Sequence, residues 1–212
     1  MPMKPTTLRG PTKLREGVQR LWRELFGPRM LYGWRRGDGV WQAHTRISSA
    51  TQVEAPERLD IGDHVYIGPF NFIDASGGLV IGEGCQITTH CALLTHSSHI
   101  AVRLMGSRYF GDPEPVGFRR APTAIGAYCF IGPHSVLMPG CRLGRGVLVR
   151  AYSYVEGPVP DFAIVAGQPA VQIGDTREID RDWLEAHPEC RADYEAWAGP
   201  PVAAASDPSA AP

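Results

Sequence analysis

Residues 125–149 read IGAYCFIGPHSVLMPGCRLGRGVLV, and their aliphatic side chains recur every six residues. The period runs through Ile125, Ile131, Leu137, Leu143 and Val149, and glycine follows three of these five. The same spacing continues upstream through Ile61, Ile67 and Ile73, then through Ile81, Ile87 and Leu93, and downstream to Val155. A short repeat of this kind predicts a solenoid of stacked units, each of which is stable only against its neighbours.

The period also predicts the geometry of one unit. Three hexapeptides form one triangular coil, with the aliphatic side chains pointing inward and short turns at the corners. About five coils then span residues 41–166, with Trp41, Ile47 and Val53 marking a weaker first coil. A spacing of six does not fit the helical period of 3.6, glycine recurs too often for helices, and the period-two runs of antiparallel strands are missing. We therefore predict an all-β fold, a parallel β-helix.

The five cysteines agree with this register and contain no CxxC pair. Cys85, Cys91, Cys129 and Cys141 each come four residues after an inward aliphatic residue, a position where Ser135, Val147 and Ser153 also occur. This position favours small buried side chains. We expect buried free thiols in a reducing compartment, with metal or disulfide roles as the minor alternative.

Composition limits the partners and the compartment. A net charge of −1 over 212 residues gives no reason to expect a nucleic-acid partner. No apolar run reaches the length of a transmembrane helix, and no signal peptide is visible. We therefore expect a cytoplasmic protein.

The basic N-terminal segment, residues 1–40, has a pattern of its own. Its apolar residues are Leu14, Val18, Leu21, Trp22, Leu25 and Phe26, and they follow the helical period up to Gly27-Pro28. This spacing predicts an amphipathic helix. Two roles stay open: a cap over the first coil, or peripheral contact of residues 13–26 with the inner face of the membrane.

The C-terminal segment predicts two further features. Residues 174–199 have a helical pattern that is interrupted near His187-Pro188. Residues 200–212 are rich in Pro, Ala and Ser, and we expect them to be disordered.

One long insertion interrupts the repeat. Residues 97–123 carry no hexapeptide spacing, and His90, His96 and His99 come just before or at the start of this loop. A protruding loop on a regular solenoid is usually functional, because the packed interior leaves no room for a site. His96 and His99 are therefore candidate functional residues, whereas the other histidines fall at turns or in the C-terminal helix.

These residues give the chain a family resemblance that covers residues 41–173. It resembles the hexapeptide-repeat, left-handed β-helix acyltransferases, in the branch of galactoside, maltose, capsule and O-antigen O-acetyltransferases. The resemblance rests on residues 87–99 (ITTHCALLTHSSH) before the insertion and on residues 124–144 after it. It also rests on Val149 to Val155 and on residues 158–170, PVPDFAIVAGQPA.

The resemblance implies an activity and its residues. We expect transfer from acetyl-CoA to a hydroxyl of a sugar or glycan, with no metal, in a homotrimer whose sites lie at subunit boundaries. His96 is the expected general base, because a neutral imidazole suits that task near neutral pH. The expected acceptor-binding residues are His99, Tyr109 and Asp112. The expected CoA-binding residues are Phe130, Gly132, Arg150, Ala151, Ser153, Gly167 and Pro169.

The chain departs from the family pattern at the donor site. Phe130 replaces the usual tryptophan, Arg150 and Tyr152 replace the glycines that flank Ala151, and Val171 replaces a common basic residue. CoA should therefore bind in a similar place with different contacts. Three alternatives stay open: N-acetylation of an amino or nucleotide sugar, a zinc enzyme like the γ-class carbonic anhydrases, and a trimeric scaffold without activity.

Overall fold

The computed structural model describes residues 12–199, and a parallel β-helix of three sheets forms its centre. Sheet A contains β2 (Trp41–Ser48), β5 (Tyr66–Ile67), β8 (Gln86–Ile87), β13 (Phe130–Ile131), β16 (Leu148–Val149) and β19 (Ala163–Gly167). Sheet B contains β3 (Gln52–Glu54), β6 (Phe72–Asp74), β9 (Ala92–Leu93), β14 (Val136–Leu137) and β17 (Tyr154–Val155). Sheet C contains β4 (Leu59–Ile61), β7 (Leu79–Ile81), β12 (Thr123–Ile125), β15 (Arg142–Leu143) and β18 (Pro158–Val159).

The chain visits sheets A, B and C in turn, so that five coils of three strands follow one another. We name the corners after the sheets they join: AB, BC and CA. Two antiparallel strands extend sheet A at its ends, β1 (Met30–Arg35) beside β2 and β20 (Ala170–Asp175) beside β19. Short 3-10 turns lie at η1 (Pro56–Arg58), η2 (Gly106–Gly111) and η3 (Pro188–Cys190).

The six-residue period places aliphatic side chains above one another inside the coils. In sheet A, Ile67 pairs with Ile87, Ile87 with Ile131, and Ile131 with Val149. The aliphatic positions that we assigned to the interior from Ile61 to Val155 are all buried, at no more than 4% exposure. The prediction of small buried thiols is also confirmed, since Cys85, Cys91, Cys129 and Cys141 are free and buried.

The corners explain the glycines and one aromatic ladder. A Cβ on Gly82 would come 2.5 Å from the backbone nitrogen of Ala127 in the next coil, so only glycine permits this stacking distance. At the AB corner, Phe70, His90, His134 and Tyr152 adopt left-handed φ values near 60°. Their rings stack coil upon coil, with centroid separations of 4.7–5.3 Å.

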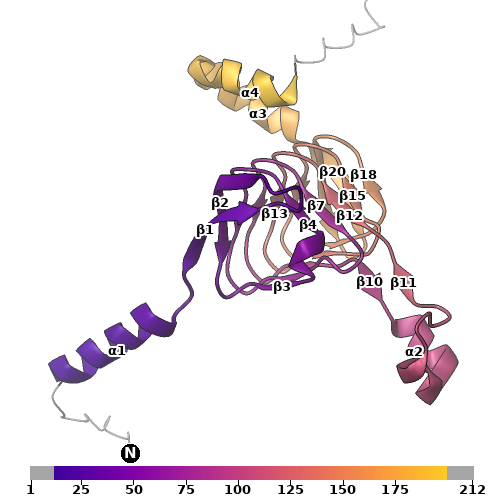
Figure 1. Ribbon diagram of the computed structural model, residues 1–212. Coiled ribbons are helices and arrows are strands. Elements are labelled where there is room, and N and C mark those ends of the chain that lie inside the picture. The colour runs from indigo at the N-terminus through magenta and orange to yellow at the C-terminus, as the bar shows by residue number, and fades with distance from the viewer. Residues whose placement is uncertain (1–11, 200–212) are drawn as a thin grey trace, which may run out of the picture.

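Three helical segments project from the coils in different directions, as Figure 1 shows along the stack. They are α1 (Thr12–Phe26), the insertion with α2 (His99–Met105), and the pair α3 (Thr176–Ala186) and α4 (Arg191–Ala198). The insertion leaves the BC corner through the antiparallel strands β10 (His96–Ser97) and β11 (Arg119–Arg120). Residues 200–212, which we expect to be disordered, lie outside the described part of the chain.

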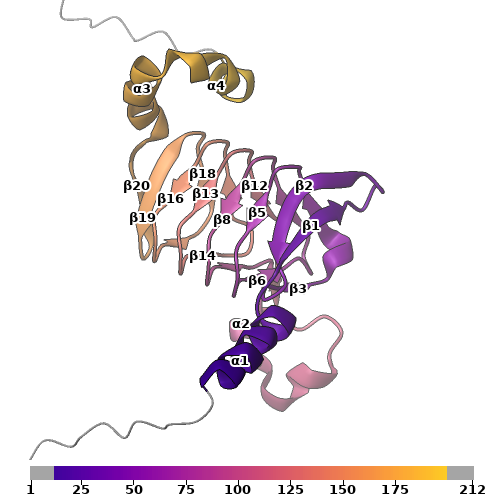
Figure 2. The same cartoon turned by 90° about the vertical axis from the view of Figure 1, so that its left-hand side faces the viewer.

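The structure does not support the cap role of the N-terminal helix. Helix α1 points away from the coils (Figures 1 and 2), and its six apolar side chains are 48–70% exposed. The hairpin of β1 and β2 occupies the first coil instead, because β1 pairs along the free edge of β2. Between residues 12 and 199, none of the helices is both long enough and apolar enough to cross a bilayer.

Candidate active site

His96 lies at the root of the insertion and contacts a buried carboxylate. Its Nδ1 atom is 2.7 Å from Oδ2 of Asp74, which is fully buried at the end of β6 in the coil before. An ionised carboxylate can only accept hydrogen bonds, so the proton of the neutral ring belongs on Nδ1. This leaves Nε2 as a hydrogen-bond acceptor on a side chain that is one-third exposed. An imidazole with its tautomer fixed in this way can accept a proton at Nε2.

Asp74 is held in place by several other donors. Its Oδ2 accepts from Thr95 N and Thr95 Oγ1, both at 2.8 Å, and from His96 N at 3.1 Å, while Oδ1 accepts from Ser76 N at 2.9 Å. Burial alone would raise the pKa of Asp74, but the hydrogen bonds from Ser76 and Thr95 outweigh it and hold the pKa well below its usual value. The carboxylate is therefore ionised at neutral pH and faces the imidazole with a full negative charge.

Two residues of the insertion complete the surroundings of His96. The ring of Phe118 stacks on the imidazole, with centroids 5.6 Å apart and planes 14° apart. The guanidinium carbon of Arg120 lies over the Phe118 ring at 5.4 Å from its centroid. Arg120 is also the strand partner of His96 in the β10–β11 pair. Phe118 and Arg120 therefore lie between His96 and the pocket of the insertion.

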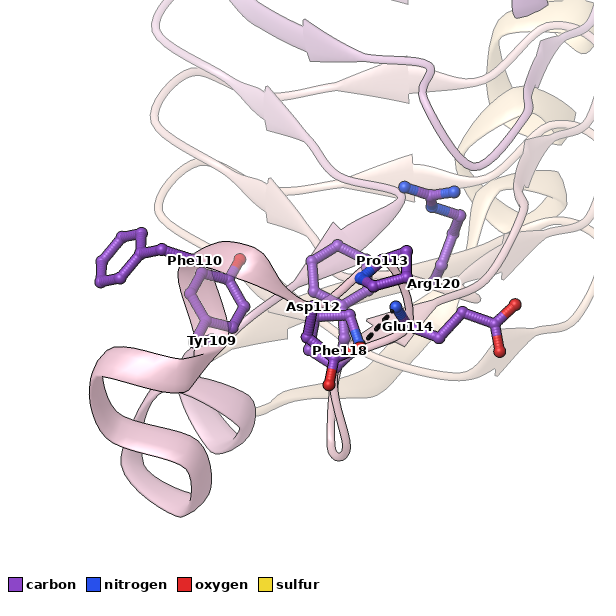
Figure 3. A pocket seen from close by; sticks show the side chains of 8 residues that line it. Tyr109, Phe110, Asp112, Pro113, Glu114, Phe118 and Arg120 are labelled. Atoms are coloured by element: carbon purple, nitrogen blue, oxygen red, sulfur yellow. Dashed lines mark hydrogen bonds between the residues drawn. The ribbon is translucent and has the colours of Figure 1, made fainter.

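This pocket has a volume of about 510 Å³ and lies within the insertion (Figure 3). Its lining residues are Tyr109, Phe110, Asp112, Pro113, Glu114, Pro115, Phe118 and Arg120. The backbone N–H of Glu114 donates to Oδ1 of Asp112 at 2.9 Å, which fixes the turn between them. Flat apolar faces beside carboxylates and one guanidinium form a lining that can contact a polyhydroxylated molecule.

The structure separates the expected acceptor residues. Tyr109 and Asp112 line the pocket, but His99 does not. His99 is the first residue of α2, is exposed, and its Nδ1 atom lies 2.7 Å from Ser97 Oγ. Within residues 12–199 it has no carboxylate partner. The geometry therefore favours His96 over His99 as the base.

Two members of the expected CoA set, Ser153 and Gly132, are buried in the AB corner. Ser153 is 1% exposed and donates its hydroxyl to the carbonyl of Arg150 at 2.6 Å. A Cβ on Gly132 would come 2.6 Å from the nitrogen of Ala151, so Gly132 permits coil stacking and is covered by the next coil. Neither residue offers a side chain to a ligand at the surface.

The other members of the CoA set are exposed around the AB corner. Arg150 and Ala151 form the corner of the fifth coil, whereas Gly167 ends β19 and Pro169 lies in the turn that follows it. Between them, Gln168 donates to the carbonyl of Tyr152 at 2.8 Å and fixes this turn against the corner. Phe130 lies on the outer face of sheet A and remains partly exposed. These five residues remain a predicted donor site.

His96 and this predicted donor site lie at different corners of one chain. His96 is at the BC corner, whereas Arg150 and Ala151 are at the AB corner, on the opposite edge of sheet B. A strand crossing sheet B covers about five extended residues, or roughly 16 Å at 3.3 Å per residue. A single chain therefore does not bring the two groups together along this face.

A second histidine–aspartate pair lies at the CA corner. His44 Nδ1 is 2.8 Å from Asp63 Oδ2, and the rings of His44 and His64 stack with planes 1° apart. Burial raises the pKa of Asp63, but hydrogen bonds from His44 and His64 lower it to about 2. Ring nitrogens bind metals within the ring plane, so two parallel stacked rings do not share a metal. This pair provides a control for the site at His96.

Sequence reasoning did not find Asp74, Phe118 and Arg120. Asp74 falls in a five-residue stretch, 74–78, whose composition is typical of a turn. Its only sequence signal is a carboxylate directly after the inward Ile73, one coil before His96. Phe118 and Arg120 lie in the insertion, where no repeat predicts which side chains face the base.

A scan against known families matches residues 122–157 to the family described as "Bacterial transferase hexapeptide (six repeats)". A chloramphenicol acetyltransferase from Morganella morganii is 42% identical over 135 residues, which cover 64% of this chain and 61% of that protein. WcaF of Escherichia coli K12, named as a colanic acid biosynthesis acetyltransferase, is 26% identical over 73% of this chain and 82% of its own length.

A solved structure supports the fold. The hexapeptide-repeat containing acetyltransferase VCA0836 from Vibrio cholerae has a TM-score of 0.50 and 20% identity, over 80% of this chain and 82% of that chain. Several curated relatives are longer than the matched region, since the chain spans 61–64% of their length. These relatives share the word acetyltransferase in their names, while the acceptors in those names differ.

Proposed function

We propose that the chain is a hexapeptide-repeat acetyltransferase that transfers the acetyl group of acetyl-CoA to a hydroxyl of a sugar or polysaccharide; the family match over residues 122–157 supports this. The observation that carries this proposal is the pair of Asp74 and His96 beside the pocket of the insertion. This pair supplies an oriented base next to a polar and aromatic cavity.

The chemistry needs one proton acceptor and no covalent enzyme intermediate. Nε2 of His96 accepts the proton of the attacking hydroxyl, the oxygen bonds to the thioester carbon, and a tetrahedral oxyanion forms. The carbon–sulfur bond then breaks, and the imidazolium returns its proton to the CoA thiolate. Asp74 stabilises the imidazolium in between, because its negative charge faces Nδ1. A backbone N–H is the expected oxyanion donor.

The cysteines support direct transfer. Four of them are buried inside the coils, and burial raises the pKa of Cys141 to about 12 and also raises the pKa of Cys91. A thiol with a raised pKa is a poor nucleophile at neutral pH. Cys190 is exposed, but it lies in η3, on a different projection from the insertion.

The pocket supports a sugar as the acceptor. Tyr109 and Phe118 provide flat apolar faces, and Asp112 and Glu114 provide oxygens that accept hydrogen bonds from hydroxyls. WcaF, the relative named for colanic acid biosynthesis, agrees with a polysaccharide acceptor. The identity with a chloramphenicol acetyltransferase adds chloramphenicol as a second candidate acceptor.

A screen of acceptors with acetyl-CoA tests this function. Release of the CoA thiol is measured with neutral sugars, oligosaccharides, amino sugars, nucleotide sugars, chloramphenicol and serine. We expect turnover with a sugar hydroxyl and a product ester that mild base cleaves. If the product is instead an alkali-stable amide of an amino sugar, the proposed O-acetyltransferase activity would have to be changed to N-acetyltransferase activity. Release of thiol with no acceptor in the set beyond water would overturn the sugar assignment.

The donor site is tested at Ala151. Because Ala151 is exposed at the AB corner, tryptophan there should leave the coils folded and fill the space expected for the CoA arm. We expect Ala151→Trp to raise the Kd for CoA by about tenfold or more, which corresponds to roughly 1.4 kcal/mol. We expect Arg150→Ala to raise KM for acetyl-CoA several-fold, because a guanidinium pairs with phosphate.

Titration calorimetry and circular dichroism provide the measurement. Glu83→Trp, an exposed substitution at the CA corner, is the matched control and should bind CoA like the wild type. Unchanged CoA affinity in a folded Ala151→Trp variant would remove this corner from the donor site.

The separation of His96 from the AB corner supports a shared site in a C3 homotrimer. Each site would take the base from one copy and the donor corner from the next, so neither half works alone. Light scattering should give the mass of three chains.

Mixed trimers test the sharing directly. At acetyl-CoA concentrations well below KM, His96→Ala and Ala151→Trp should each have little activity alone, whereas trimers refolded from an equal mixture should regain about a quarter of the wild-type sites. This fraction follows because one arrangement in four joins an intact base to an intact donor corner. An inactive mixture would place both groups in the same chain's site.

A further inference from the structure

Helix α1 carries an apolar face that is exposed to solvent among residues 12–199. Leu14, Val18, Leu21, Trp22, Leu25 and Phe26 all lie on one side of the helix and are 48–70% exposed. Trp22 and Phe26 contact each other, with ring centroids 4.4 Å apart. A 15-residue helix is marginal in water without tertiary packing, so this face needs a partner.

A second exposed apolar face lies at the other end of the chain. Ile179 and Trp183 are one turn apart on α3, and Trp183 is 64% exposed. The inner side of the α3–α4 pair is anchored, because Trp197 of α4 stacks on Tyr128 at 4.6 Å and contacts Phe162 at the CA corner. The outer side of α3 is therefore presented on a fixed support.

The two faces carry opposite charge. Residues 12–36 contain seven basic and two acidic side chains, a net charge of +5. Residues 176–198 contain three basic and seven acidic side chains, a net charge of −4 with histidine neutral. Both segments are thus amphipathic, exposed and complementary in charge, which favours contact between them.

They do not meet within one chain. Figure 1 shows α1 and the α3–α4 pair projecting from different sides of the coils, and Figure 2 shows them below and above the stack rather than beyond its ends. We propose that α1 of each copy packs on the outer face of α3–α4 of the neighbouring copy. Around a three-fold axis this contact repeats three times and closes, so it leaves no free apolar face.

A second copy of the chain can cover the apolar faces of both α1 and α3, whereas a membrane would cover only that of α1. An anionic lipid surface would attract the basic face of α1, but it would repel the acidic α3–α4 pair and leave Ile179 and Trp183 uncovered. Contact between copies covers both faces at once. This inference rests on the trimer in the proposed function and on no catalytic step.

Hydrogen exchange of the full chain tests the contact at a distance. In Trp183→Glu, we expect the amides of α1 to exchange about 10-fold faster or more, although no residue of α1 has changed. In Trp22→Glu, the amides of α3 should respond in the same way. Leu104→Glu, an exposed substitution in α2, is the control and should leave α1 unchanged. Circular dichroism checks that each variant keeps its coils.

Charge-reversal variants provide a second, independent test of this contact. Arg15→Glu with Arg23→Glu should deprotect α1, and adding Asp182→Arg with Glu185→Arg should restore its protection. If the mass is that of a trimer and neither set of variants changes hydrogen exchange in α1, the contact between α1 and α3–α4 is wrong and the trimer is retained. If the mass is that of one chain, both fail. Protection of α1 only in the presence of phosphatidylglycerol vesicles, unaffected by Trp183→Glu, would assign α1 to the membrane instead.

Discussion

Replacing His96 by alanine is expected to lower kcat by roughly 10²–10⁴-fold, the usual contribution of a general base. The expected loss falls on kcat because proton removal occurs in the transition state, while CoA binding uses residues at another corner. Acceptor turnover is measured at saturating acetyl-CoA, and CoA binding is measured separately by calorimetry. The Kd for CoA should stay within a few-fold of the wild type.

The chain offers two matched controls for this variant. His44 also pairs with a carboxylate, Asp63, at 2.8 Å, but it lies at the CA corner away from the insertion. His44→Ala should therefore leave kcat unchanged. His99→Ala should lower kcat less than His96→Ala, because the hydrogen-bond partner of the His99 ring within residues 12–199 is a hydroxyl, that of Ser97, and not a carboxylate. Loss of turnover in His99→Ala with a fully active His96→Ala would transfer the role of base to His99.

The sequence could predict the coils because their physics is local and repeated. An aliphatic side chain every six residues has to point inward in every coil, and a glycine after it is required wherever the next backbone comes too close. Gly82 is such a position, since a Cβ there would clash with Ala127. The same register predicted the burial of Cys85 and Cys129, because both come four residues after an inward aliphatic side chain.

The six-residue period does not predict which side chains from different coils contact each other at the corners. Ser153 and Gly132 were assigned to the ligand from a motif, but the packing of the AB corner covers both. Asp74 was assigned to a turn, although its side chain points into the corner and accepts five hydrogen bonds from Thr95, Ser76 and His96. A residue 22 positions away in sequence became a neighbour only because one coil advances by about that length.

The N-terminal helix shows a different limit. Its existence followed from the 3.6-residue period of its apolar residues, but its partner did not, because an amphipathic pattern gives the width of an apolar face and not what covers it. The structure rules out the first coil as that partner within one chain. The charge of α3–α4 then favours a neighbouring copy over the membrane contact that the sequence also allowed.

The carboxylate behind His96 gives the second large effect. Asp74→Asn is expected to lower kcat by roughly 10-fold to 10³-fold, because the amide lacks the charge that stabilises the imidazolium and can favour the wrong tautomer. Asn has the same shape and still accepts from Thr95, so the variant should fold. Asp63→Asn, the same substitution in the pair with His44, is the control and should keep full activity.

Three readouts separate orientation of the base from a merely structural role. First, Asp74→Asn should add little to the loss in His96→Ala, since residues that act as a unit are not additive. Second, the acid limb of the kcat/KM profile should move to lower pH, because removing a negative charge beside the imidazole disfavours its protonated form. An unshifted limb together with additive losses in the double variant would show that Asp74 supports the fold without acting through His96.

The third readout is stability against pH. The pKa of Asp74 is lowered in the folded state, so its carboxylate stabilises the fold fully above its unfolded pKa of about 3.9. This contribution is lost as pH falls below that value towards the lowered one. The melting temperature of the wild type should therefore fall between pH 5 and about pH 2 more steeply than that of Asp74→Asn. Parallel curves for the two proteins would mean that the buried carboxylate is not ionised beside His96, which would remove the basis for its role in catalysis.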